Sequence, residues 1–238
     1  MIDDLALDHI RRPTVTRPLL GLTILAVEDS LYACDALRLM CLHSGARLRR
    51  ADCLKSARRH LQVYRPSVVV VDMGLPDGCG AELIDELSTS LPRVSVLLGT
   101  SADNFSEDVA FAAGADGFLA KPIANLAVFQ NAILQHMPQD RQPFGLRQIH
   151  KEPIRPDPIA FREDMAHITE VLNGNVDDRT LDYVAQFLSG VARSADDVAL
   201  ATAATDLADA RAAGTPFQGK VARLAGMVKA RLSDAVAI

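Results

Sequence analysis

Three carboxylates and one lysine stand directly after apolar segments of strand length. Glu28 and Asp29 follow TILAV, and Asp72 follows VVVV. Lys121 follows a later segment, GFLA, and is itself followed by a proline. In an open parallel sheet, the carboxyl ends of the strands form the crevice in which ligands bind. The four side chains are therefore candidates for one binding site.

This group of acids favours a magnesium site. Neighbouring strands lie about 4.8 Å apart, so the three carboxylates would converge. Carboxylates this close repel one another, and oxygen ligands that leave room for water suit Mg²⁺. A lysine beside them can hold a phosphoryl oxygen as a point charge. The plainer alternative is that the acids solvate a loop or cap a helix, and three acids on paired strands make that the weaker explanation.

The elements that must position these residues alternate between strand and helix from Gly21 onward. Apolar runs of strand length followed by amphipathic segments are typical of βα units. The VVVV run is apolar at every position, as expected when helices cover both faces of a sheet. Five such units predict an α/β fold of the flavodoxin-like, doubly wound kind with a parallel sheet. The predicted strands are Thr23–Val27, Ala46–Ala51, Val68–Val71, Val94–Leu98 and Gly117–Ala120, and the predicted helices are 31–43, 53–64, 80–90, 104–113 and 124–136.

The rest of the chain divides by composition. Residues 1–20 lack periodicity and predict a flexible N-terminal arm, and 138–158 contain five prolines and predict a linker. Beyond the linker, helical patterns cover 159–172, 178–193, 196–213 and 217–234. Asp178 and Ser194 are candidate N-caps, and Gly214 is a candidate helix stop. The prediction is a domain over 21–137 followed by a small all-α four-helix bundle over 159–238.

Composition limits the classes of partner and compartment. The 238 residues are 49% hydrophobic and 23% charged with a net charge of −5, so we expect a soluble globular protein without a broad basic face for nucleic acid. The apolar runs are too short to cross a bilayer, and the first residues lack the order of a secretory signal, so we expect a cytoplasmic protein. The four cysteines have no CxxC spacing, which argues against a zinc or dithiol site. Cys34 and Cys41 share a helix face and read as buried small hydrophobes.

Three segments in order, AVEDS, VVVVDMGLPDGCG and GADGFLAKP, resemble the signatures of the response regulator receiver family over residues 21–137. The resemblance implies transfer of a phosphoryl group from a histidine kinase or a histidine phosphotransfer protein to Asp72. It implies that Lys121 contacts the phosphoryl oxygens and that the peptide bond after Lys121 is cis. The implied Mg²⁺ ligands are Glu28, Asp29, Asp72 and the backbone carbonyl of Gly74.

The family also places a hydroxyl residue at the end of the fourth strand, where it turns toward the phosphoryl group. Counting back from Lys121 by the usual spacing gives Gly99, and Thr100 is the next residue. We favour Thr100 as the switch hydroxyl and keep Gly99 as the alternative. Phe118 stands at the family's aromatic switch position. With Gly99 at the switch, coupling would be weak and the protein could be a phosphate sink or a constitutive binder.

The helical half shows no basic recognition helix and no glycine-rich nucleotide loop. The segments QFLSGVA and LADARAAG resemble the core of histidine phosphotransfer domains, with Gln186 in place of the phosphorylated histidine. Glutamine cannot form a phosphoramidate, so the resemblance implies a degenerate domain. The alternative is that any pair of Ala/Leu-rich helices looks similar. His167 is a second candidate acceptor, although a lone helical histidine is more often a surface residue.

The sequence therefore predicts a two-component response regulator that is not an enzyme. Its output would be contact with a downstream protein or a homodimer through the helical domain. One alternative is a phosphorylation-independent adaptor with the same fold. A less favoured alternative is a phosphatase of the haloacid-dehalogenase kind, which needs a second aspartate two residues beyond the nucleophile, where Gly74 stands.

Overall fold

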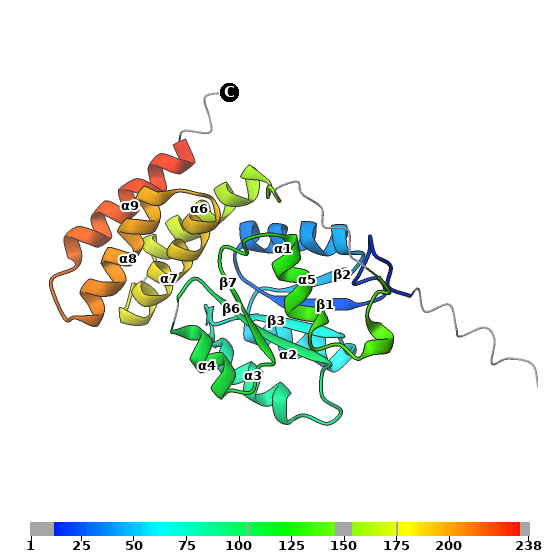
Figure 1. Ribbon diagram of the computed structural model, residues 1–238. Helices are drawn as coiled ribbons and strands as arrows, with labels where there is room; N and C mark the ends of the chain where they lie inside the picture. Colours follow the sequence, from blue (N-terminus) through cyan, green and yellow to red (C-terminus); the bar gives the residue numbers. More distant parts are fainter. Residues whose placement is uncertain (1–11, 104, 146–153, 175, 234–238) are drawn as a thin grey trace, which may run out of the picture.

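The computed structural model describes residues 12–103, 105–145, 154–174 and 176–233. Its first half contains a five-stranded parallel sheet in the order β2-β1-β3-β6-β7. Figure 1 shows this sheet between two layers of helices, with a second group of helices beside it. The strands are β1 (Thr23–Val27), β2 (Arg47–Ala51), β3 (Val68–Asp72), β6 (Val96–Ser101) and β7 (Gly117–Ala120). The order confirms the flavodoxin-like fold that the sequence predicts.

Two apolar cores lie on opposite faces of the sheet. Successive residues of a strand point to opposite faces. Val68 and Val70 accordingly pack under α1 and α5, whereas Val69 and Val71 pack under α2, α3 and α4. The run of four valines is apolar throughout because both faces are covered. The helices are α1 (Leu31–Ser44), α2 (Leu54–Val63), α3 (Gly80–Thr89), α4 (Ser106–Ala112) and α5 (Leu126–Leu134).

The sheet extends further toward the carboxyl ends of its strands than the sequence suggested. β3 includes Asp72, which lies in register with Thr100 of β6. β6 begins at Val96 rather than Val94 and continues to Ser101. A short hairpin of β4 (Gly74–Leu75) and β5 (Gly78–Cys79) follows β3 and was not predicted, because two-residue strands carry no periodic signal. A short 3₁₀ helix, η1 (Gln139–Arg141), follows α5.

The segment before the sheet is more ordered than the arm predicted over 1–20. Residues 1–11 lie outside the described residues, but Leu19 is fully buried in the core formed with α1 and α5. A turn between Thr14 and Arg17 precedes it. Of the predicted linker over 138–158, residues 146–153 lie outside the described part of the chain. Its last proline, Pro158, is the first residue of a helix whose N-cap is Asp157.

Four helices form the second half: α6 (Pro158–Asn173), α7 (Asp178–Ser194), α8 (Val198–Ala212) and α9 (Gln218–Ser233). Each contacts two of the others around a core that includes Ile168, Leu188 and Val228. The N-cap predictions were wrong by one and three residues, because the capping side chains are Asp177 and Asp197. Among the residues that the structure describes, the helices are too short or too polar to cross a membrane.

Candidate functional site

The three predicted carboxylates do converge at the carboxyl ends of the strands. Glu28 and Asp29 follow β1, Asp72 ends β3, and these two strands pair directly in the sheet. One oxygen atom of each residue lies within 4.8 Å of an oxygen of the other two. Glu28 and Asp72 are buried, with exposed fractions of 1% and 7%. The sequence prediction of an acidic cluster at this edge is confirmed.

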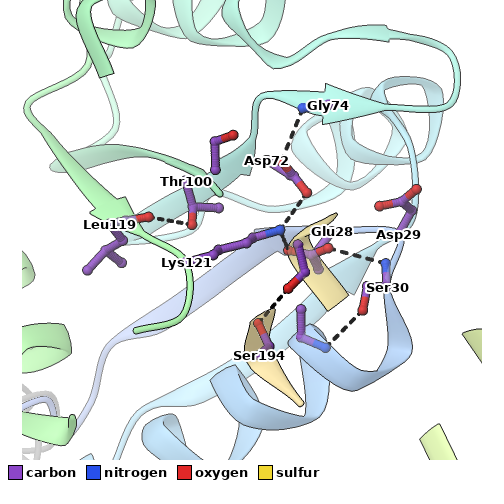
Figure 2. A network of polar contacts seen from close by, with 12 residues as sticks. Glu28, Asp29, Ser30, Asp72, Gly74, Thr100, Leu119, Lys121 and Ser194 are labelled. Carbon is purple, nitrogen blue, oxygen red and sulfur yellow. Dashed lines mark hydrogen bonds and ion pairs between the residues drawn. The ribbon is translucent and has the colours of Figure 1, made fainter. Parts of the chain in front are cut away.

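Lys121 reaches the cluster from the end of β7. Its Nζ atom lies 2.6 Å from the Oδ2 atom of Asp72 and 2.6 Å from the Oε2 atom of Glu28. Figure 2 shows the lysine side chain running between these two carboxylates. The Lys121–Pro122 peptide bond is cis, as the resemblance implied. A single ammonium group thus faces two buried carboxylates.

Burial and crowding set the ionisation of this cluster. Burial and, to a smaller extent, the nearby charge of Asp72 together raise the pKa of Asp29 to about 7, against a hydrogen bond from Tyr183 that lowers it. Burial likewise raises the pKa of Glu28, and Lys121 opposes this. For Lys121, burial alone would lower the pKa, but the charges of Asp72 and Glu28 outweigh burial and raise it. Burial and crowding thus disfavour the charged forms of Asp29 and Glu28, and a bound cation would favour them.

The cluster has the donor atoms that a hard cation needs. The Oδ1 atom of Asp29 is buried and has no hydrogen-bond partner among the described residues. A buried acceptor without a partner is costly and is often explained by an ion or a water molecule. The three side-chain candidates are carboxylates, and carboxylate oxygens suit Mg²⁺ better than a soft metal. The Gly74 amide donates to the Oδ1 atom of Asp72 at 3.1 Å, so the predicted fourth ligand residue is also adjacent.

Thr100 and Gly99 occupy different surroundings. Thr100 lies in register with Asp72, and its buried hydroxyl donates to the carbonyl of Leu119 at 2.7 Å. Gly99 packs toward α4, where an added Cβ atom would lie 2.7 Å from the Cβ atom of Ala110. The same added atom would lie 3.1 Å from the ring of Phe118, which is half-buried. Gly99 is therefore explained by close packing, and Thr100 lies opposite Asp72 in the neighbouring strand, while its role as the switch hydroxyl stays a prediction.

The sequence did not show that the second half of the chain covers this cluster. Tyr183 of α7 donates its hydroxyl to the Oδ2 atom of Asp29 at 2.6 Å. A small cavity of about 20 Å³ remains between the two halves, with Asp72 and Lys121 on one side and Gln186 on the other. Ser101 also lines it and was missed, because the pattern singled out only its neighbour Thr100. The segment around Gln186 that resembles phosphotransfer domains was the one feature of the sequence that drew attention to α7.

Comparison with known families agrees with the geometry of the first half. The response regulator receiver domain matches residues 24–133. The similarity to phosphotransfer domains lies outside that match and stays a prediction.

Among curated proteins, the virulence transcriptional regulatory protein PhoP of Salmonella typhimurium is 30% identical over 100 residues, which is 42% of this chain and 45% of PhoP. The KDP operon transcriptional regulatory protein KdpE of Escherichia coli is 30% identical over 99 residues, covering 42% and 44% of the two chains. The match therefore spans less than half the length of these relatives. Among solved structures, the chemotaxis protein CheY4 of Vibrio cholerae has a TM-score of 0.45 at 21% identity, covering 49% of this chain and 98% of CheY4.

Proposed function

Because residues 24–133 of this chain match the response regulator receiver domain, we propose that the protein is a two-component response regulator that accepts a phosphoryl group on Asp72. The observation that carries the proposal is the contact of Lys121 with Asp72 inside a cluster of three converging carboxylates. The donor is a histidine kinase or a histidine phosphotransfer protein. The protein would act by binding other proteins and not as an enzyme on small molecules.

The transfer follows from the arrangement of charge. A carboxylate oxygen of Asp72 attacks the phosphorus atom, an oxygen–phosphorus bond forms, and the nitrogen–phosphorus bond to the donor histidine breaks. The electron pair of that bond stays on the imidazole, which takes up a proton. Catalysis of such a transfer is mostly positioning and neutralisation of the phosphoryl oxygens. Lys121 supplies one positive charge beside Asp72.

Bound Mg²⁺ would supply the remaining positive charge. Glu28, Asp29 and Asp72 would hold it, together with the backbone carbonyl of Gly74. The buried and unpartnered oxygen of Asp29 supports this assignment. Lys121 pairs with both Asp72 and Glu28, so it would offset part of their charge when no cation is present.

The proposed switch residue is Thr100. Its hydroxyl donates to the carbonyl of Leu119, so a phosphoryl group on Asp72 would compete with that carbonyl for the same proton. Phosphorylation adds a charge of about −1.5 to −2, which must bias a two-state element to be read. Rotation of Thr100 would break its hydrogen bond to the Leu119 carbonyl in β7, which offers such a two-state element. An element of this kind favours a signalling role over a simple phosphate sink.

The output would be protein contact through α6–α9 and not DNA binding. PhoP and KdpE are named transcriptional regulators, but their similarity to this chain is confined to about 100 residues. The helical region makes polar contacts with the acceptor site itself, for example between Tyr183 and Asp29. The division into a receiver, a linker and a helical domain, and a cytoplasmic location, remain predictions from the sequence.

The test uses acetyl phosphate and Mg²⁺ with the full-length chain. We expect the intact mass to rise by one phosphoryl group, and Asp72→Asn to abolish the adduct. Lys121→Met should fold but label far more slowly, whereas Lys229→Met, at an exposed position of α9, should label at the wild-type rate. Continuous phosphate release without an adduct would support the phosphatase alternative. A chain that stays unmodified after incubation with acetyl phosphate and with phosphorylated donor proteins would support the phosphorylation-independent adaptor.

A further inference from the structure

The helical region is bound over the acceptor crevice, and its contacts involve the strand-end loops that surround Asp72. We infer that α7 is an intramolecular partner that occupies the surface a phosphodonor must contact. A phosphodonor and α7 therefore cannot bind to this surface at the same time. The inference rests on the proposed function of Asp72. It adds that the crevice around Asp72 is the surface for which the phosphodonor competes and that α7 is its competitor.

The first contact fixes the acidic loop after β1. Tyr183 donates its hydroxyl to Asp29, and its ring packs against Phe187 with 5.7 Å between ring centroids. His167 of α6 lies 3.2 Å from the same hydroxyl. A residue of the helical region is thus hydrogen-bonded to a proposed metal ligand.

A second contact holds the start of α1. Asp164 of α6 is 2% exposed and accepts hydrogen bonds from three donors of the receiver. Its Oδ1 atom accepts from the Leu31 amide at 2.7 Å. Its Oδ2 atom accepts from the Ser30 hydroxyl at 2.7 Å and from the Tyr32 amide at 3.1 Å. A helix N-terminus favours a negative partner, so Asp164 acts as a cap supplied from the other half of the chain.

The other two contacts reach the loops after β3 and β6. The Gln186 side chain lies so close to Gly74 that a Cβ atom at position 74 would overlap its carboxamide group. Arg193, near the end of α7, donates to the carbonyl of Ala102 at 2.6 Å. Between them, Gly190 brings the backbone of α7 near Ala102 and Lys121. These contacts place α7 across the crevice from one side to the other.

What remains of the crevice is too small for the reaction. The cavity of about 20 Å³ has room for roughly one water molecule. A phosphoryl group on Asp72 carries three oxygens, and a protein donor must bring its histidine within bonding distance of the same carboxylate. Gln186 and Phe187 line the side of the cavity from which it would come. The docked arrangement is therefore closed to a protein donor.

A disulfide between Ala102 and position 190 provides the test. An ideal Cβ atom at Gly190 lies 3.8 Å from the Cβ atom of Ala102, which is the mean separation in disulfides. We would introduce Ala102→Cys and Gly190→Cys together with Cys53→Ser and Cys79→Ser, because the last two thiols are accessible. The oxidised full-length chain keeps α7 on the crevice. The reduced chain releases it without any further change of sequence.

Labelling of Asp72 by acetyl phosphate and Mg²⁺ should be slower in the oxidised form by about tenfold or more, and reduction should restore it. The variant with Ala102→Cys but without Gly190→Cys controls for the oxidant. It should be labelled at the same rate after oxidation and after reduction. Equal labelling of the locked and reduced double variant would overturn the inference and leave the proposed function standing. Failure of the reduced variant and of the wild-type chain to label would instead overturn the proposed function.

A second measurement opens the crevice instead of locking it. Arg193→Ala removes the contact with Ala102 and should raise the labelling rate severalfold. Arg179→Ala removes the same charge from an exposed position of α7 and should leave the rate unchanged. An equal rise in both variants would point to net charge as the cause and would contradict a closed crevice.

Discussion

Lys121 lies 2.6 Å from both Asp72 and Glu28, and this shared contact is the most informative detail at the scale of single residues. The ammonium group thus lies beside the carboxylate that would attack the phosphorus atom, where it can neutralise the phosphoryl oxygens. Cys34 and Cys41 are the contrasting case, since they are buried in α1 and form no disulfide. They behave as the small hydrophobes that their spacing predicted.

These two thiols should make the folded chain less stable in alkali. Burial raises the pKa of Cys34 and of Cys41 to about 12, from 9.0 in an exposed thiol. Between these values the folded state binds more protons than the unfolded state, so the free energy of unfolding falls as pH rises from 9 toward 12. Urea unfolding across this range should show the fall, and Cys34→Ala with Cys41→Ala should flatten it. An unchanged slope in that variant would show that other groups cause it.

At the scale of elements, the glycine in β6 connects packing with the switch. β6 lies between β3 and β7 in the sheet. Its successive residues point to opposite faces of the sheet, one of which is covered by α4. Gly99 faces α4, and the absence of a side chain lets Ala110 and Phe118 approach the strand. Thr100 faces Asp72 in the neighbouring strand. Despite the irregular spacing before Lys121, a threonine thus stands opposite Asp72, and its role as the switch stays a prediction.

Gly99→Ala should destabilise the receiver through overpacking. The added methyl group would lie 2.7 Å from the Cβ atom of Ala110, so α4 must move away. Overpacking of this kind costs about 1–3 kcal/mol of unfolding free energy, which urea unfolding would measure. Gly226→Ala is the matched control, because an added Cβ atom on exposed α9 meets no atom within 4 Å. There the change should stabilise the helix by up to about 1 kcal/mol. A neutral Gly99→Ala would mean that α4 is free to shift.

At the scale of the whole molecule, the two halves are joined through buried polar groups as well as through apolar packing. Asp164 and Tyr183 connect the helical region to the residues around Asp29. The ring of Tyr32 in α1 also packs edge-on against Phe161 of α6, with 5.8 Å between centroids. Figure 1 shows the four helices lying beside the sheet as one group. Loss of either half would therefore leave polar atoms of the other without partners.

We expect the two halves to unfold in one transition. Breaking a buried hydrogen bond so that one partner is left unsatisfied costs about 1–3 kcal/mol, and several such bonds cross this interface. Hydrogen exchange in urea should give the same midpoint for amides of β3 and of α7. Asp164→Asn combined with Arg193→Ala should separate the two midpoints, whereas Arg179→Ala should not. Separate midpoints in the wild-type chain would show that the interface contributes little.

The sequence by itself determined the receiver fold and the acidic cluster. These are local: each strand is a continuous apolar run, and parallel pairing then brings Glu28, Asp29 and Asp72 to one edge of the sheet. It also identified Lys121, because the residue directly follows a strand. It placed several boundaries and two N-caps imperfectly, since neighbouring polar residues such as Asp177 and Asp178 compete for the same role.

Only the tertiary structure decided where the helical half lies. Tyr183 and Asp29 are separated by 154 residues, and Ser30 and Asp164 by 134 residues. No period or spacing connects residues so far apart, because the packing of one folded surface on another brings them together. The same packing explains Gly99 by a neighbour on α4 and sets Gln186 against Gly74. The sequence predicted an acceptor site, and the packing of α6 and α7 showed that this site is covered.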